Sequence, residues 1–279
     1  MFEKFSRSWG LLKASASVLR QDKELMVFPL VSTIAALIVV GSFIAPIFAF
    51  GWIDQVDEGT PPILLYAWLF LFYLVLYFVI FFFNTALVGA AMIRLRGGDP
   101  TVADGFRIAF GRIVPILGYA AIAATVGLLL RMLEERLGIV GRWISGLLGA
   151  AWTVASFLAV PVLVVENVGP VDAVKRSVDL LRRTWGENII GNAGVGLAFF
   201  LMYLVLGLVA AAAVTFASSV SLVLTATIGA LAVAAFVVLA LVHASLSGIY
   251  AAALYRFAAE GETGGAFASN ALDQAFRAR

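Results

Sequence analysis

The chain has 279 residues, of which 62% are hydrophobic and only 13% are charged, and its formal net charge is +2 at pH 7. A soluble domain usually carries about 25% charged residues, so this composition excludes a water-soluble globule and predicts an integral membrane protein. The chain contains no Cys and a single His, which excludes disulfide frameworks, Cys-based metal sites and His-rich metal chemistry. We therefore expect neither a metal nor a cofactor.

Apolar runs without charged residues occur six times along the chain, and crossing a hydrocarbon core takes about 20 such residues. The last two runs share one uncharged stretch, residues 188–255, which must fold back; the polar cluster from Ser218 to Gly229 predicts the reversal. The expected fold is all-α, a polytopic helical membrane protein with a single integral membrane domain, residues 1–279. The expected spans are residues 25–53, 63–93, 113–130, 143–165, 188–216 and 229–255. Five spans are the alternative, if one run at an end of the chain lies flat on the surface.

Basic residues are distributed unequally between the two sides of this arrangement. With six spans, 16 of the 19 Lys and Arg residues fall on the side of the N-terminus, which the positive-inside bias assigns to the cytoplasm. We expect a multi-pass protein of the plasma (inner) membrane with both termini cytoplasmic, including a tail at 256–279. No cleavable signal peptide is expected, because the first apolar run is much longer than the 7–15 residues typical of one.

A basic amphipathic helix is expected at the membrane interface before spans 1, 3 and 5. The first comprises residues 1–24, with Ser15 on its polar face and an apolar face of Phe2, Phe5, Trp9, Leu12, Ala16 and Leu19. The second, residues 98–112, has a Thr101–Asp104 capping signal, and the third occupies residues 169–183. Such helices can lie among lipid headgroups, although the first could equally pack on the other cytoplasmic segments.

Two groups of residues resemble the signature of a known family. One group is the run from Val160 to Glu166, then Gly169-Pro170, Arg176-Ser177 and Thr184-Trp185-Gly186; the other is Phe83-Asn84-Thr85-Ala86-Leu87 with Gly97-Gly98-Asp99-Pro100. They resemble an uncharacterised family, a domain of unknown function, of bacterial six-span integral membrane proteins. The first group is also distantly similar to the membrane domain attached to some glycerophosphodiester phosphodiesterases. The resemblance implies six spans and brings no established activity. Because this chain has no added catalytic domain, the phosphodiesterase activity is not carried over to it.

The expected partners are membrane lipids with anionic headgroups, with a protein partner or a second copy of the chain as further candidates and no nucleic acid. Basic side chains near the cytoplasmic surface are the predicted contacts for headgroups or a partner: Lys175, Arg176, Arg182, Arg183, Arg107 and Arg112. Glu166 is predicted to pair with one of these arginines and fix the loop.

Three polar residues inside the spans are predicted to make contacts between helices: Asn84, His243 and Ser247. His243 and Ser247 are four residues apart and share a helix face, beside a ladder of small residues formed by Ala240, Ala244, Gly248 and Ala252. Small residues let helices approach closely. A pH-sensing or substrate role for His243 is the alternative.

Span two is rich in aromatic residues, with ten among the eighteen from Tyr66 to Phe83. We expect this bulky span to face lipid or a partner, or to line a lipid groove, and the small-residue spans five and six to form the packed centre.

No catalytic motif of hydrolases, metalloproteases or nucleotide-binding proteins is present, so no catalytic residue is assigned. The first hypothesis is a non-enzymatic membrane protein that organises or regulates membrane components through its basic helices. The alternative is a transporter or channel for a lipid-like or neutral solute, and a membrane-embedded hydrolase using His243 is the third.

Overall fold

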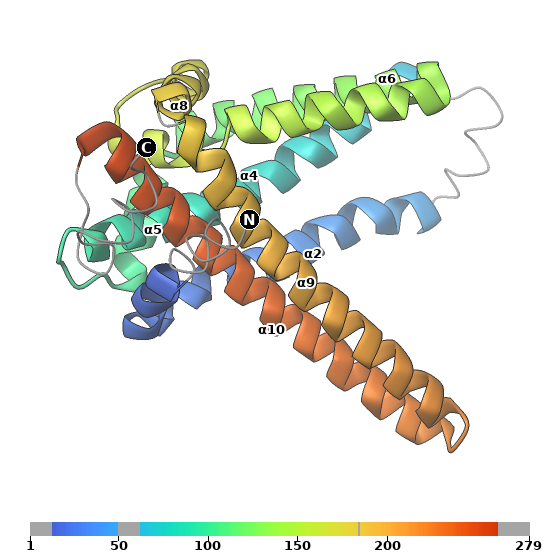
Figure 1. Cartoon of the computed structure of the whole chain (residues 1–279). Coiled ribbons are helices and arrows are strands. Elements are labelled where there is room, and N and C mark those ends of the chain that lie inside the picture. The colour runs from blue at the N-terminus through green and yellow to red at the C-terminus, as the bar shows by residue number, and fades with distance from the viewer. Residues whose placement is uncertain (1–12, 50–61, 184, 262–279) are drawn as a thin grey trace.

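A computed structural model describes residues 13–49, 62–183 and 185–261 of the chain, and within these ranges every regular element is a helix (Figure 1). Residues 13–21 are helical. The elements that follow are η1 (Lys23–Met26), α2 (Val27–Ala49), α4 (Pro62–Leu95), α5 (Val102–Gly111), α6 (Ile113–Ala155), α7 (Ala159–Val165), α8 (Pro170–Arg183), α9 (Trp185–Ser218), α10 (Leu222–Tyr255) and the π-helix η2 (Arg256–Glu260).

Five helical segments are long and apolar enough to cross a membrane: Lys23–Ile47, Tyr66–Leu95, Ile113–Val165, Ala198–Ser218 and Leu222–Glu260. The prediction of an all-α protein with apolar helices of membrane-spanning length is therefore confirmed.

The segment Ile113–Val165 is a helical hairpin, because α6 reverses its direction at Gly138. The backbone of Gly138 has φ +56° and ψ −125°, which lies outside the helical region. Across the reversal, the Ser145 hydroxyl donates a hydrogen bond to the Glu134 carboxylate. In a continuous helix these two residues would lie about 16 Å apart along the axis. Residues 113–137 and 139–155 are thus two antiparallel stretches, which Figure 1 shows running side by side.

The reversal between α9 and α10 occupies Ser219–Ser221, inside the predicted polar cluster. Ser221 caps α10, since its hydroxyl accepts a hydrogen bond from the Leu224 backbone N–H at 3.1 Å. Helix α10 begins seven residues before the expected start of this span at about residue 229, so Thr225 and Thr227 lie inside the helix. Their hydroxyls donate to the carbonyls of Ser221 and Val223, at 2.9 and 2.8 Å, and so remain hydrogen-bonded within the helix.

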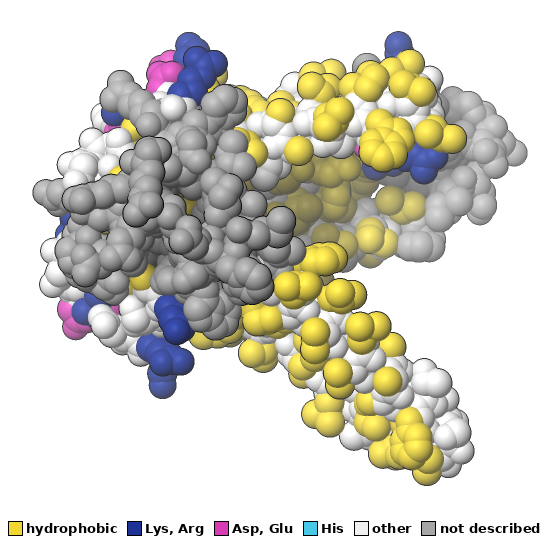
Figure 2. Space-filling view, viewed as in Figure 1, with side chains coloured by type: hydrophobic (Ala, Val, Ile, Leu, Met, Phe, Trp, Pro, Cys, Tyr) yellow, Lys and Arg dark blue, Asp and Glu magenta, His cyan; other side chains and the backbone are white. Residues whose placement is uncertain are grey.

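The helices form two diverging arms joined at one end (Figure 1). The first arm consists of α2, α4 and α6, and the second arm is the α9–α10 hairpin. The base, where the arms meet, contains residues 13–21, η1, α5, α7, α8 and η2. The space-filling view shows a gap between the arms, whose surfaces are largely hydrophobic (Figure 2).

The other helices pack mainly around α4, which contains span two, rather than around a centre made only of the small-residue spans. Helix α4, which contains span two, packs against α2, α5, α6, α7 and α10, whereas α9 packs mainly on α10. The aromatic side chains of α4 stack on neighbouring helices, as Phe81 does on Tyr119 with ring centroids 4.4 Å apart. Such pairs hold the bulky helix against its neighbours, although Phe82 is the only one of the ten aromatic side chains from Tyr66 to Phe83 that is buried.

The described part of the N-terminal leader packs on the protein rather than standing apart from it. Ala14, Val18 and Leu19 are buried in the core of the base. Ser15 is only 1% exposed, so its predicted place on a polar face was wrong. Residues 13–21 therefore follow the alternative in which the leader packs on other segments of the protein. Most of the predicted apolar face, from Phe2 to Leu12, lies outside the described residues.

Candidate functional site

A crevice of about 310 Å³ lies where α10 of the second arm meets α2 and α4 of the first. We call it the interarm crevice. Its walls are mainly apolar and include Ile80, Phe83, Phe157 and Pro161, and three polar side chains, Ser32, Asn84 and Ser247, also line it. Asn84 and Ser247, which the sequence singled out separately, are thus brought together from α4 and α10.

Gly248 permits the close contact between the arms beside the crevice. A Cβ atom on Gly248 would lie 2.5 Å from Leu87 Cδ2 and 3.6 Å from Asn84 Oδ1, so a larger residue would force α10 away from α4. The neighbouring Ala252 is fully buried. The prediction that the small residues of the ladder let helices approach closely is confirmed at Gly248 and Ala252.

The polar groups of the crevice differ in their hydrogen bonds from hydroxyls nearby in the sequence, such as those of Thr33 and Ser245. Thr33, next to Ser32, donates to the Pro29 carbonyl at 2.8 Å, and Ser245 donates to the Leu241 carbonyl at 2.8 Å. Among the described residues, by contrast, Ser32, Asn84 and Ser247 have no hydrogen-bond partner. Their donors and acceptors are therefore available at the surface of the crevice.

His243 lies on α10 beside the face that lines the crevice, in the contact between α9 and α10. Its ring stacks on Phe199 with centroids 4.1 Å apart and an interplanar angle of 14°, and Tyr203 lies 6.0 Å away. His243 faces α9, whereas Ser247 faces the crevice, so their shared helix face does not bring the two side chains to the same neighbours. Residues four apart are offset by about 40° around a helix, which is enough to direct them to different neighbours. The contact between helices predicted for His243 is confirmed.

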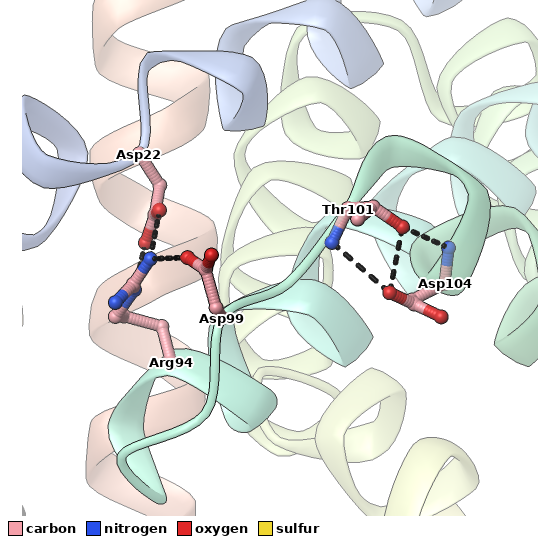
Figure 3. A network of polar contacts seen from close by, with 5 residues as sticks. All are labelled: Asp22, Arg94, Asp99, Thr101 and Asp104. Carbon is pink, nitrogen blue, oxygen red and sulfur yellow. Dashed lines mark hydrogen bonds and ion pairs between the residues drawn. The ribbon is translucent and has the colours of Figure 1, made fainter.

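Charged side chains are concentrated in the base, where Arg94 at the end of α4 joins two carboxylates (Figure 3). The guanidinium donates to both carboxylate oxygens of Asp22 and to one of Asp99. Asp22 is 8% exposed and Asp99 is 92% exposed, so only the Asp22 pair is shielded from solvent. This pair ties the start of η1 to the end of α4.

The predicted capping signal is a complete capping box at the start of α5 (Figure 3). The Thr101 hydroxyl and backbone N–H donate to Asp104 Oδ2 at 2.6 and 3.1 Å, and the Asp104 backbone N–H donates back to the hydroxyl at 3.2 Å. These hydrogen bonds, the Thr101 hydroxyl first, lower the pKa of Asp104. The cap therefore strengthens the base at neutral pH and weakens only as the pH falls through this lowered pKa.

A second polar cluster joins α4 to η2 and was missed from the sequence. Arg256 donates to the Leu95 carbonyl and, at 3.2 Å, to Glu260, which also pairs with Arg96 at 2.7 Å. Arg256 is 5% exposed, so it is packed into the base, and its predicted place at the start of a cytoplasmic tail stays a prediction. The helix continues through residue 260, and the four-residue spacing of Arg256 and Glu260 was the available signal.

Glu166 fixes the connection between α7 and α8, as the sequence predicted. Its Oε1 accepts hydrogen bonds from Arg176 at 3.1 Å and from the Tyr255 hydroxyl at 3.0 Å. Arg176 is thus occupied by an internal contact. The carboxylate holds α8 against the base of α10.

The other basic residues predicted to meet headgroups lie at the surface of the base. Arg107 pairs with Asp104 at 3.1 Å and is 78% exposed, and Lys175 lies 3.5 Å from Asp172 and is 72% exposed. Arg112 donates to Asn167, and Arg182 is exposed. The side chain of Arg183 lies outside the described residues. Contact of these cations with headgroups stays a prediction.

Comparison with known proteins gives one family match, a family of unknown function (DUF6159) over residues 63–265. This match covers most of the chain, including α4 to α10 and the interarm crevice except for its wall on α2. No curated protein matches the chain. The chain belongs to this family.

Proposed function

We propose, for this member of a family of unknown function, that the protein is a non-enzymatic membrane protein that holds a lipid-like molecule in the interarm crevice. The observation that carries the proposal is the crevice itself, which combines apolar walls with the available polar groups of Ser32, Asn84 and Ser247. Binding sites for small molecules typically have this character, mostly apolar with a few placed polar groups. Between two apolar arms in a bilayer, the surrounding molecules are lipids.

We further propose six spans in a bacterial plasma membrane, with both termini and the base cytoplasmic. The reversal of α6 at Gly138 supports counting Ile113–Val165 as two spans, and the positive-inside bias supports placing the base in the cytoplasm. Because the chain has no Cys, single introduced cysteines report topology directly. With an impermeant thiol reagent, we expect Val140→Cys and Ser219→Cys to react in intact cells and Arg182→Cys only after permeabilisation. If Val140→Cys and Ser219→Cys reacted from opposite sides of the membrane, this result would contradict six spans.

Filling the crevice tests the function. Ala244 lines the crevice on α10, and Ala240, one turn away on the same helix, does not line it. We expect Ala244→Leu to reduce the lipid that copurifies with the protein, measured by native mass spectrometry, by at least about tenfold, which corresponds to about 1.4 kcal/mol of binding free energy. Ala240→Leu adds the same apolar volume outside the crevice and should retain the lipid. Equal retention by both variants would contradict binding there.

A second candidate function, organising membrane components through the basic surface, is favoured by the exposure of Arg107, Lys175 and Arg182 on the base. Cations at this level attract anionic headgroups with about 1 kcal/mol each. Under this function, Arg182→Glu should weaken crosslinking in native membranes to an anionic lipid or a protein partner and leave lipid in the crevice unchanged. Unaltered crosslinking would exclude a role for Arg182.

A further inference from the structure

We infer that the interarm crevice selects an uncharged lipid whose head carries hydroxyl groups or ester carbonyls, bound with the head at Asn84 and Ser247 and the chains directed along the arms. This inference rests on the proposed function and adds the chemical class of the ligand. It follows from three properties of the crevice: its charge, its hydrogen-bonding groups and its size.

None of the described residues that line the crevice is charged. The charged groups next along the chain lie further towards the base. Arg94 follows Val88 by six residues, and Glu166 follows Pro161 by five. Arg256 follows Ala251 by five residues, and Glu24 precedes Pro29 by five. The two arginines among them are already engaged, Arg94 with Asp22 and Arg256 with Glu260. An anionic head in the crevice would therefore have no counter-charge in a medium of low dielectric constant, which is strongly unfavourable.

The available polar groups match a neutral oxygen-rich head. A serine hydroxyl can donate one hydrogen bond and accept two, and an Asn amide can both donate two and accept two. A head with hydroxyls and carbonyls offers both complements, so it can pair with Ser247 and Asn84 together. Leaving such groups unpaired away from water costs about 1–3 kcal/mol each, and this cost favours occupancy by a hydrogen-bonding ligand.

The size of the crevice indicates which part of the ligand it holds. Its volume of about 310 Å³ is at the lower end of the range for sites that enclose a complete small molecule, about 300–1,000 Å³. It fits a small head and the first part of an acyl chain, lying against Phe83, Phe157 and Ile80. The rest of the chain then continues along the exposed apolar surfaces of the arms, on residues such as Val237 and Leu37.

Photolabelling in vesicles tests the ligand class. The purified protein is reconstituted with one of three lipids that carry a photoreactive group near the head: diacylglycerol, which is uncharged, phosphatidylcholine, which is zwitterionic, or phosphatidylglycerol, which is anionic. We expect peptides containing Asn84 or Ser247 to be labelled by the diacylglycerol probe at least about fivefold more than by either phospholipid. This ratio corresponds to about 1 kcal/mol of selectivity.

Variants connect the selectivity to the polar groups. Asn84→Leu and Ser247→Ala should each reduce labelling by diacylglycerol at least about threefold, while Ser42→Ala, a hydroxyl of α2 that bonds its own backbone, should leave labelling unchanged. Ser247→Ala removes a single oxygen atom and serves as the conservative variant if Asn84→Leu misfolds.

Two outcomes separate this inference from the proposed function. In the first, the phosphatidylglycerol probe labels the crevice peptides as much as the diacylglycerol probe or more, or Ser247→Ala has no effect on labelling. This outcome would overturn the ligand class but would leave lipid binding in the crevice intact. In the second, none of the three probes labels either crevice peptide. This outcome would overturn both the ligand class and the proposed lipid binding.

Discussion

Replacing Arg94 by Met is expected to lower the free energy of unfolding by about 3 kcal/mol, at the lower end of the range for breaking a buried ion pair. Both carboxylate oxygens of Asp22 accept hydrogen bonds from Arg94, and Asp22 is 8% exposed. The substitution leaves this carboxylate without its cation in the base. The lower end applies because Arg94 itself is 22% exposed. Unfolding by titration with a denaturing detergent, followed by tryptophan fluorescence, measures the change.

Asp99→Asn provides the matched control for the same cluster. Asp99 also accepts a hydrogen bond from Arg94 but is 92% exposed, and exposed ion pairs contribute about 1 kcal/mol or less. We therefore expect Asp99→Asn to cost under about 1 kcal/mol. Similar losses for Arg94→Met and Asp99→Asn would show that burial of Asp22 does not determine the strength of this junction.

Gly105→Ala is expected to destabilise the protein by about 1–3 kcal/mol, the usual cost of overpacking a core. A Cβ atom at this position would lie 2.4 Å from Phe28 Cζ and 2.8 Å from the Ala86 carbonyl oxygen. The Phe28 ring is fully buried, and the carbonyl belongs to the backbone of α4, so neither can move away easily. Helix α5 would have to lift from α2 and α4. The same unfolding measurement reports this change.

Gly111→Ala, at the other end of α5, should have a small effect of opposite sign. A Cβ atom there meets nothing within 4 Å, and Ala is favoured over Gly in helices by roughly 0.5–1 kcal/mol. A loss at Gly111 as large as that at Gly105 would mean that α5 tolerates no added methyl group anywhere, and close packing at Gly105 would not be the cause.

Local features of the sequence predicted the helices well. The helix predicted at residues 169–183 is present as α8, Pro170–Arg183, and the Thr101–Asp104 signal is a complete capping box. These features depend on neighbours within a few residues. Helix α10 begins before the expected start of the last span, because hydroxyl groups such as that of Thr225 can bond within a helix as well as in a turn.

The arrangement of the helices could not be predicted in the same way. In a membrane protein, side chains that face lipid and side chains that face other helices are both apolar, so hydrophobic periodicity does not distinguish them. This is why α4 was not recognised from the sequence as the helix on which the others pack. The divergence of the two arms has no signal in the sequence that we can identify.

The candidate site was predicted only in part. Asn84 and Ser247 were identified as polar groups within spans, but their meeting in one crevice depends on the packing of α4 against α10 at Gly248. Ser32 was missed because nothing in the sequence separates it from Thr33, whose hydroxyl bonds its own backbone. Arg256 was missed because its burial results from contacts with distant residues such as Leu95.

A structure determined in a lipid bilayer disc, with native lipids retained, tests the central claim most directly. The account predicts diverging arms and elongated density between α4 and α10, with one end beside Asn84 and Ser247. Arms packed together along their length, with Phe83 and Phe157 filling the space beside Ala244 and no density at Asn84, would contradict the claim that the interarm crevice binds a lipid-like molecule.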